Sequence, residues 1–391
     1  MRNLKRSYEE INEKIKQGDA VVMTAEEIIE VVEREGVEQA TKEVDVVTTG
    51  TFGAMCSSGV FLNFGHSEPP IKMTKAWLNG VPAYTGLAAV DAYIGATEPR
   101  EDGNLDYGGA HVIEDLIAGR PVRLRATAHG TDCYPRREID TYVSLDTLNQ
   151  AYMFNPRNAY QNYGVATNSS ERTLFTYMGK LLPKYGNASY SSAGQLSPLL
   201  NDPHLRTIGI GTRIFLGGAQ GYVAWEGTQY RTTTPERNGV PTGASRNLAV
   251  VGDLRDMSTD FIRALDFQKY GVSLGVGVGV PIPILDEEMM KCVSIRDDQI
   301  FAPVLDYAVQ SRTRKPMKEV SYAELRSGSI ELAGKKVRTS SLSSYAKAKQ
   351  IAELLKKQML EGEFLLTRPV AMLPTERAQK PLDLHSREEV A

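Results

Sequence analysis

Hydrophobic and polar positions near the start of the chain predict two helices and a strand. Residues 7–15 mix charged and apolar side chains with the spacing of a short helix. Thr24 and Glu27 have the spacing of a capping box, and the apolar stripe after them predicts a second helix that ends at Gly36. The β-branched residues of segment 44–49 then predict a strand. The chain therefore begins with both element types.

The central part of the chain continues this mixture, with β-branched residues gathered around glycines. A short helix is predicted over residues 110–118, and the segments 121–128 and 140–145 are predicted to be strands. The glycine-rich segments 208–221 and 275–281 carry β-branched residues between their glycines. This composition predicts buried strands to which other parts of the backbone approach closely.

Three further segments have features of helices. They are residues 148–159, 260–269 and 343–360, and the last has the clearest apolar stripe, with Gly362 at its end. Because helices and strands interleave along the chain, we predict an α/β fold with a mixed sheet, interleaved helices and glycine-rich buried strands. The sequence does not define the order of the strands.

The domain organisation is expected to be simple. We predict one catalytic unit over residues 1–365, with a possible division into two subdomains near residues 287–303. The charged, proline-containing segment 366–391 is expected to be a loose tail.

Composition and charge favour a soluble enzyme with a small-molecule substrate. Of the 391 residues, 41% are hydrophobic and 24% are charged, as in ordinary globular proteins, and the net charge is −3. The sequence has no long basic run that would indicate binding to nucleic acid, and it has no apolar run long enough to cross a membrane. Residues 1–17 lack the apolar core of a signal peptide, so we expect a cytoplasmic protein.

The cysteine and histidine content argues against metal sites. Three cysteines far apart do not form a disulfide framework, and they are too few for the four thiolates of a typical iron–sulfur cluster. The five histidines are isolated in the sequence, without the close spacing of a zinc site. They are His66, His111, His129, His204 and His385. We therefore predict no metal site.

Cys133 is the first candidate for chemistry. It follows a predicted strand, with His129 four residues before it and with Arg136 and Arg137 within the four residues after it. Positive charge and neighbouring histidine lower the pKa of a thiol and make it a nucleophile or a sulfur carrier. Local sequence alone leaves the alternative that Cys133 is a small buried apolar residue, which is the usual fate of a free cysteine.

Cys56 is the second candidate, because it also follows a predicted strand and lies in a turn. Ser57 and Ser58 follow it, and their hydroxyl and backbone N–H groups could hold a thiolate or a substrate carboxylate. His66 could act as an acid or base, since its ordinary pKa is near neutrality. For both residues a purely structural role is the competing interpretation, and Cys292 is expected to be structural.

The glycine-rich segments do not fit nucleotide-binding motifs. A dinucleotide fingerprint would need a small residue where Ile214 and Val280 stand, and no phosphate-binding loop ends in Gly-Lys-Ser or Gly-Lys-Thr. A nicotinamide-dependent oxidoreductase is therefore a weak alternative.

Several separated motifs together resemble the homocysteine-biosynthesis family of anaerobic archaea and bacteria. They are TGTFGAMCSSG at 49–59, NFGHSEPPIK at 63–72 and AHGTDCYPR at 128–136. The glycine-rich segments 209–221 and 275–283 are similar to the family as well. The resemblance spans roughly nine-tenths of the chain, and this order of motifs is much more specific than any one of them.

The resemblance implies the transfer of sulfur to L-aspartate semialdehyde, with reduction to L-homocysteine. It implies that Cys133 is the essential cysteine and that Cys56 is the second one. It also implies that electrons come from a separate iron–sulfur protein, similar to a ferredoxin, rather than from a covalently bound cofactor. Many family members end in a pair of CBS domains, which this sequence is too short to hold.

We therefore hypothesise that a Cys133 persulfide attacks the aldehyde and that Cys56 resolves the sulfur–sulfur bond, leaving a disulfide for external electrons to reduce. His129 or His66 would supply protons, while Arg136, Arg137 and the Ser57–Ser58 turn would hold the substrate carboxylate. A homo-oligomer is also expected. The competing functions are a sulfur-relay protein without turnover and the nicotinamide enzyme.

Overall fold

A nine-stranded sheet forms the centre of the computed structural model, which describes residues 6–382 and 384. Neighbouring strands in this sheet pair antiparallel. One strand, β3 (Thr51–Ala54), pairs with β22 off the main path. The main path, in order, is β21 (Ile262–Asp266), β22 (Val272–Gly279), β16 (Arg213–Leu216), β17 (Ala219–Glu226), β20 (Leu248–Asp253), β10 (Gln150–Asn158), β4 (Gly59–Asn63) and β7 (Asp91–Gly95).

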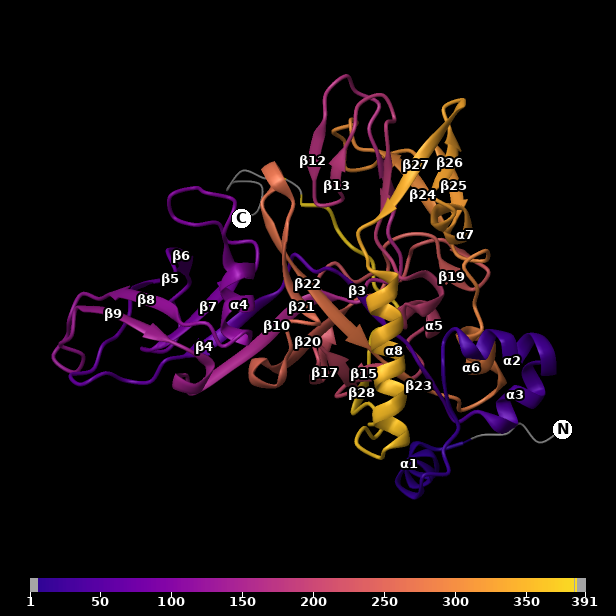
Figure 1. Ribbon diagram of the computed structural model, residues 1–391, viewed down its shortest axis with the longest axis horizontal. Coiled ribbons are helices and arrows are strands. Elements are labelled where there is room, and N and C mark those ends of the chain that lie inside the picture. Colours follow the sequence, from indigo (N-terminus) through magenta and orange to yellow (C-terminus); the bar gives the residue numbers. More distant parts are fainter. Residues whose placement is uncertain (1–5, 383, 385–391) are drawn as a thin grey trace.

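The long helix α8 (Tyr345–Leu360) lies against β22 and explains its glycines (Figure 1). A Cβ atom at Gly277 would lie 2.8 Å from the Ile351 side chain, and one at Gly279 would also lie 2.8 Å from it. Only glycine leaves room for the helix at this distance. The predicted buried, glycine-rich strand with a close neighbour is therefore confirmed.

The strands β4 and β7 continue the central sheet into an arm that projects to the left in Figure 1. The arm contains helix α4 (Gly109–Ile117), whose buried face packs into the same hydrophobic core as β4 and β7. The loop that joins β8 to β9 lies at the free end of the arm (Figure 1). The four-stranded sheet of the arm has the order β6 (Val81–Ala83), β5 (Lys75–Leu78), β8 (Val122–Thr127) and β9 (Glu138–Val143).

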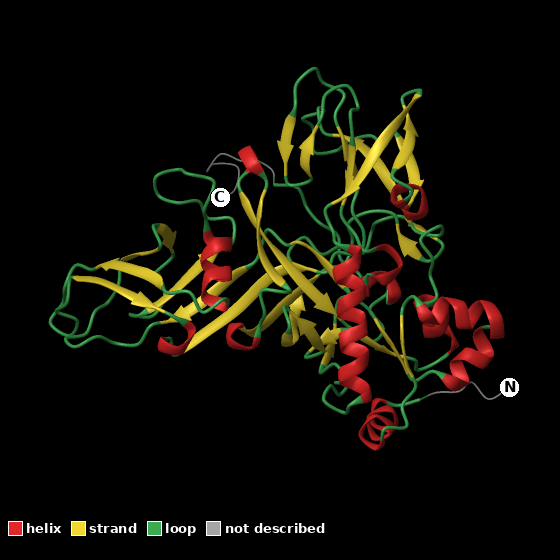
Figure 2. Cartoon of the chain, in the orientation of Figure 1, coloured by secondary structure: helices red, strands yellow, loops and turns green. Residues whose placement is uncertain are grey.

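A second group of strands lies on the opposite side of the central sheet (Figure 2). Its six-stranded sheet is completed by α7 (Tyr322–Arg326), and the hairpin of β12 (Leu174–Thr176) and β13 (Gly179–Leu181) stands beside it. The sheet has the order β25 (Lys318–Ser321), β24 (Phe301–Asp306), β11 (Val165–Thr167), β14 (Ala188–Tyr190), β27 (Lys335–Ser341) and β26 (Ser329–Leu332).

Small elements complete the fold. The helices are α1 (Tyr8–Gln17), α2 (Glu27–Glu35), α3 (Val37–Glu43), α5 (Pro198–Asn201) and α6 (Glu287–Val293). A three-stranded sheet joins β1 (Val22–Thr24), β2 (Val46–Thr48) and β23 (Pro281–Pro283), and two short pairs are β15 (Gly209–Ile210) with β28 (Ala371–Met372) and β18 (Glu236–Arg237) with β19 (Val240–Pro241).

The structure confirms the mixed α/β class and most of the predicted elements. Ser7 and Gly18 begin and end α1, and the side chain of Thr24 accepts a hydrogen bond from the Glu27 backbone at the start of α2. The helices predicted over residues 148–159 and 260–269 are wrong, because these segments form β10 and β21. In β10 Ala151 and Met153 are buried while Tyr152 is exposed, which is the period of a strand.

The first part of the segment expected to be a loose tail is docked on the body. Strand β28 pairs with β15, and the backbone N–H of Arg377 donates to the hydroxyl of Thr232 at 2.9 Å. The hydroxyl of Tyr230 donates to the carbonyl of Pro374 at 2.8 Å. The chain is therefore ordered at least as far as Arg377, whereas His385 lies outside the described residues.

Over the part of the chain that the structure describes, no helix is long and apolar enough to cross a membrane. Within the same residues no three His, Cys, Asp or Glu side chains gather as a metal site would require.

Candidate active site

Cys56 lies in the turn between β3 and β4. The hydroxyl of Ser58 closes this turn by donating to the carbonyl of Met55 at 2.7 Å. The hydroxyl of Ser273, at the start of β22, donates to the Cys56 sulfur at 3.1 Å. The thiol is thus held between two strands of the central sheet and is mostly, but not completely, buried.

The surroundings of Cys56 favour its neutral form. Burial raises the pKa of the Cys56 thiol, and the hydrogen bond from Ser273 and the positive charge of Arg157 offset this only in part. The net shift is upward from the ordinary thiol value. At neutral pH Cys56 is therefore a protonated thiol, and it becomes a nucleophile only when a base or a change of surroundings removes the proton.

Cys56 lines a cavity with a volume of about 730 Å³. Its lining contains two arginines, Arg157 and Arg312, and no Asp or Glu side chain. Hydroxyl groups supply most of the other polar atoms. They belong to Thr51, Ser57, Thr97, Ser191, Ser192, Ser197, Ser343, Tyr160, Tyr163, Tyr177 and Tyr270. A cavity of this kind, with positive charge and many hydroxyls, is suited to a small anionic molecule.

Arg157 is positioned by the strand that carries it. Its backbone N–H donates to the side-chain oxygen of Asn155 at 2.8 Å, and its Nε donates to the hydroxyl of Thr228 at 2.9 Å. No hydrogen bond or ion pair from its terminal nitrogens to another described residue is found. Those N–H groups are therefore available to a carboxylate in the cavity.

Tyrosine rings form one wall of the cavity. Tyr163 lies 5.0 Å from Tyr160 and 6.2 Å from Tyr177, measured between ring centroids, and Tyr177 lies 6.3 Å from Tyr270. Burial raises the pKa of Tyr163, so its hydroxyl stays protonated. The rings come from three separate segments of the chain, and together they present hydroxyl donors to the cavity.

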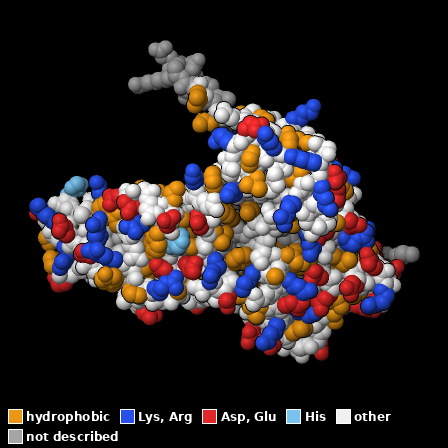
Figure 3. All heavy atoms as spheres, turned by 45° about the horizontal axis from the view of Figure 1, so that its top comes forward, with side chains coloured by type: hydrophobic (Ala, Val, Ile, Leu, Met, Phe, Trp, Pro, Cys, Tyr) orange, Lys and Arg blue, Asp and Glu red, His pale blue; other side chains and the backbone are white. Residues whose placement is uncertain are grey.

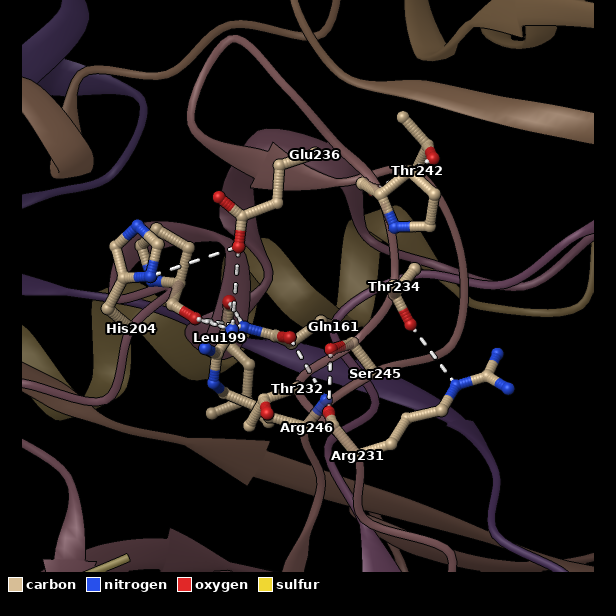
Figure 4. A network of polar contacts seen from close by, with 12 residues as sticks. Gln161, Leu199, His204, Arg231, Thr232, Thr234, Glu236, Thr242, Ser245 and Arg246 are labelled. Atoms are coloured by element: carbon tan, nitrogen blue, oxygen red, sulfur yellow. Dashed lines mark hydrogen bonds and ion pairs between the residues drawn. The ribbon is translucent and has the colours of Figure 1, made fainter. Parts of the chain in front are cut away.

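A buried polar network fixes the segment that carries Tyr160 and Tyr163 (Figure 4). The side chain of Gln161 donates to the carbonyls of Leu199 and Pro203, at 2.9 and 2.7 Å, and accepts from the backbone N–H of Arg246. Since every one of these groups is buried, breaking the network would leave polar atoms unpaired. The tyrosine wall is therefore held rigidly.

The two serines after Cys56 have different positions. Ser57 reaches the cavity, and its hydroxyl donates to Asn155 Oδ1 at 3.1 Å. Ser58 is fully buried behind it, where its hydroxyl accepts from Asn155 Nδ2 at 2.7 Å. Of the two predicted substrate-binding serines, the structure brings Ser57 to the cavity.

Cys133 lies elsewhere, in the exposed loop between β8 and β9 at the free end of the arm. Reciprocal backbone hydrogen bonds of 2.9 and 3.2 Å between Thr131 and Tyr134 close this loop. The hydroxyl of Thr131 lies 3.5 Å from the Cys133 sulfur. The turn therefore presents the thiol to solvent.

The other predicted site residues gather around Cys133 rather than Cys56. The ring of His66 stacks on Tyr134, beside Cys133, with centroids 5.7 Å apart. Arg136 donates to the backbone carbonyls of residues 68 and 69, at 2.6 and 3.0 Å. Arg137 lies over Gly130, and His129 is exposed on the same loop. Figure 3 shows basic and histidine side chains at this end of the arm.

The comparisons with known proteins agree with the motif pattern. Residues 20–366 match the profile of a family described as "Homocysteine biosynthesis enzyme, sulfur-incorporation". The chain belongs to this family. The resemblance predicted from the motifs is therefore confirmed.

Two relatives are identical to this family member at more than half of the aligned positions. The "L-aspartate semialdehyde sulfurtransferase" of Methanosarcina acetivorans is 54% identical over 379 residues, which cover 97% of this chain and 74% of the relative. The protein of the same name from Methanocaldococcus jannaschii is 53% identical over 383 residues, covering 94% of this chain and 73% of the relative. An uncharacterised protein of Methanothermobacter thermautotrophicus is 33% identical over 340 residues. No solved structure matches the chain.

Cys292, the third cysteine of this homocysteine-biosynthesis family member, lies apart from both sites. It is half-buried on α6, and burial raises the pKa of its thiol to about 11. His204 and Arg206 line a smaller hollow with it, but neither reaches the Cys56 cavity.

Sequence reasoning missed the cavity residues that do not lie next to a cysteine. Arg157 fell within a segment predicted to be a helix, and Arg312 stands in a polar loop without a motif. Tyr177 and Tyr270 lie at hairpin tips that come together only in the folded chain. The frequency of tyrosine, 18 residues, was the one available signal, and it does not say which of them meet.

Proposed function

We propose that this chain is an L-aspartate semialdehyde sulfurtransferase, which replaces the aldehyde oxygen of its substrate by sulfur and yields L-homocysteine. The observation that carries the proposal is the identity of 54% and 53% to two relatives of that name, over nearly the whole chain. The matched family region, residues 20–366, includes both Cys56 and Cys133.

The Cys56 cavity supports this proposal as the substrate site. Aspartate semialdehyde has a free carboxylate, and Arg157 and Arg312 provide positive charge without a competing acid in the lining. Guanidinium groups bind carboxylates through paired hydrogen bonds, which fixes both position and orientation. Ser57 and the tyrosine hydroxyls can take the remaining polar groups of the substrate.

Two thiols are sufficient for the sulfur transfer if they work in sequence. Sulfide attacks the Cys133 sulfur of a Cys56–Cys133 disulfide, which gives a Cys133 persulfide and a Cys56 thiol. The outer sulfur of the persulfide adds to the aldehyde carbon, and the aldehyde oxygen takes a proton. Cys56 then attacks the inner sulfur, which re-forms the disulfide and releases the substrate as a hydroxy-thiol.

Reduction completes the reaction outside this cycle. The released hydroxy-thiol loses water to become a thioaldehyde, and two electrons with two protons convert the thioaldehyde to the thiol of homocysteine. Since the disulfide is regenerated, one electron pair per turnover is enough. We propose that a separate iron–sulfur protein, similar to a ferredoxin, supplies these electrons, because the chain has only three cysteines of its own.

The arm tip has groups for proton transfer and substrate guidance. His66 and His129 lie in the two loops at this tip, where either can donate the proton that the aldehyde oxygen takes. Arg137 adds positive charge to the loop that carries Cys133, whereas Arg136 donates to backbone carbonyls and holds the loop.

The test is homocysteine formation from aspartate semialdehyde and sulfide with a strong one-electron reductant. Cys56→Ser and Cys133→Ser are compared with wild type, and Cys292→Ser serves as the matched control because Cys292 lies outside the cavity. We expect loss of homocysteine in the first two variants and full activity in the control. Full activity in Cys133→Ser would refute the cycle, and persulfide without homocysteine in wild type would indicate a sulfur-relay protein.

A further inference from the structure

The two thiols of the proposed cycle lie beyond opposite ends of β4. Cys56 precedes the strand by three residues, and His66, which stacks beside Cys133 on Tyr134, follows it by three. A five-residue strand is about 13 Å long between its terminal Cα atoms, and the turns at both ends add to that separation. A disulfide requires Cα atoms within about 7 Å of each other.

The strand between them is held on both sides. Each of its five residues pairs with β10, and each also pairs with β7. Bringing the two ends of β4 together within one chain would break both ladders, because an extended strand cannot fold back on itself. The arm is thus continuous with the central sheet and cannot bend at β4 at a small free-energy cost.

The loop that carries Cys133 is also tied to the arm. The backbone N–H of Arg136 donates to the carbonyl of Pro70 at 3.2 Å, and the Arg136 side chain binds the two preceding carbonyls. At the base of the loop, Thr74 donates twice to the carbonyl of Thr127, at 2.8 and 3.0 Å. The loop therefore follows the arm and cannot reach the Cys56 cavity of its own chain by a hinge of its own.

We propose that a second copy of the chain completes the active site. The loop of residues 128–137 from one copy enters the cavity of the other, so that Cys133 works with Cys56 of the partner subunit. This inference rests on the proposed function, since it takes the two thiols as one reacting pair. In a twofold-symmetric dimer the same contact occurs twice and gives two equivalent sites.

The size and the entrance of the cavity fit a protein loop in addition to the substrate. Its volume of about 730 Å³ is in the range that holds drug-sized ligands, whereas aspartate semialdehyde has only four carbon atoms. At the entrance, Tyr177 and Tyr270 are 37% and 42% exposed, although both are large aromatic residues. Exposed tyrosines are enriched where protein surfaces meet.

Charge also favours this pairing. The cavity lining contains two arginines and no acid, and Arg312 makes no ion pair with another described residue. Asp132 precedes Cys133 on the exposed loop and likewise makes no ion pair in the described part of the chain. An aspartate delivered with the thiol would neutralise one of the cavity arginines and so fix the direction in which the loop enters.

The arm carries further surface that a partner would cover. Tyr84 pairs with Tyr93, Tyr93 with Phe61, and Phe61 with Tyr152, so that four neighbouring segments place an aromatic row on one face. Tyr84, Phe61 and Tyr152 are 64%, 40% and 43% exposed. At about 200 Å² for each side chain, roughly 300 Å² per copy is left open. Two copies would cover roughly 600 Å² through this row, and the loops and cavity rims would have to supply the rest of the ~1,200–2,000 Å² of a stable interface.

The first experiment needs no catalytic activity. The purified protein is treated with diamide, which takes two electrons and two protons from a pair of thiols and leaves a disulfide. We expect a covalent dimer on non-reducing gels for wild type and Cys292→Ser, and monomers for Cys56→Ser and Cys133→Ser. Peptide mapping should join Cys56 to Cys133. A Cys56–Cys133 bond within a monomer would overturn the proposal, as would a dimer joined only through two copies of Cys133.

The second experiment uses activity to separate the two arrangements. Cys56→Ser and Cys133→Ser chains are co-expressed, so that about half of the dimers are mixed and each mixed dimer has one intact pair of thiols across the interface. We expect about a quarter of wild-type homocysteine formation, although each variant alone is inactive. No recovery in verified mixed dimers would place the pair within one chain. If wild type forms no homocysteine, the proposed function fails, while the diamide result still decides the interface.

Discussion

Replacing Arg157 by Gln tests whether the Cys56 cavity binds the substrate carboxylate. The change keeps a polar side chain of similar length but removes the charge and the paired N–H groups. A hydrogen bond to a charged group contributes about 1.5–3 kcal/mol, and tenfold in affinity corresponds to about 1.4 kcal/mol. We therefore expect kcat/KM for aspartate semialdehyde to fall by roughly 10- to 100-fold.

The assay follows homocysteine formation over a range of aspartate semialdehyde concentrations, with sulfide and reductant held in excess. Arg338→Gln is the matched control, since Arg338 is exposed on β27, away from the cavity lining. Thermal unfolding of both variants separates a loss of substrate binding from a loss of the Arg157–Thr228 hydrogen bond. An Arg157→Gln enzyme with wild-type kcat/KM would refute the assignment of this cavity to the substrate.

Three other predictions concern the thiols and the packing of the central sheet. Burial raises the pKa of Cys56, so its alkylation should increase with pH around a midpoint above the ordinary thiol value of ~8.5. Exposed Cys133 should be modified first at neutral pH. A Cys56 midpoint at or below ~8.5 would contradict this. Gly277→Ala should lower the free energy of unfolding by about 1–3 kcal/mol, because the new Cβ would lie 2.8 Å from a side chain of α8. Gly95→Ala is the control and should not lower the free energy of unfolding in this way, because the space around Gly95 is open. Burial raises the pKa of Cys292 to about 11, so the free energy of unfolding of wild type should fall between the ordinary thiol pKa and pH 11. Chemical denaturation of Cys292→Ser should show a smaller fall over the same pH range. Equal falls in the two proteins would contradict the raised pKa of Cys292.

Local signals allowed many elements to be predicted from the sequence. Ser7 begins α1 and Gly18 ends it in a left-handed conformation, as the residue types require. The glycines of β22 are buried because α8 lies on them, which the β-branched residues between the glycines already indicated. Helix caps and glycines set between β-branched residues are local patterns, so they can be recognised in a single sequence.

The two predicted helices that proved to be strands show where such signals fail. β10 contains Pro156 and several polar residues, and its side chains alternate between Met153 in the core and Tyr152 outside. The polar positions do not follow the alternation strictly, because buried Asn155 is there to hold the Cys56 turn. The hydrogen bonds that hold the Cys56 turn therefore place a polar residue in the buried face and hide the period of the strand.

The two cysteines could be predicted from the sequence, but their separation in the structure could not, for a topological reason. Cys56 and Cys133 both follow a strand, which in a parallel sheet would place them at one common edge. Here β3 belongs to the central sheet and β8 to the sheet of the arm, and both sheets are antiparallel, so their strand ends point to different places. Which sheet a strand joins depends on long-range pairing, and the sequence motifs alone do not contain it.

The most direct test of the sulfur-transfer account follows one labelled sulfur atom. The protein in its disulfide form is incubated with isotopically labelled sulfide, and peptide mass spectrometry locates the label before and after aspartate semialdehyde and reductant are added. We predict a labelled persulfide on Cys133 that disappears as labelled homocysteine forms. Label that remains on Cys133, or labelled homocysteine formed equally fast by Cys133→Ser, would contradict the account.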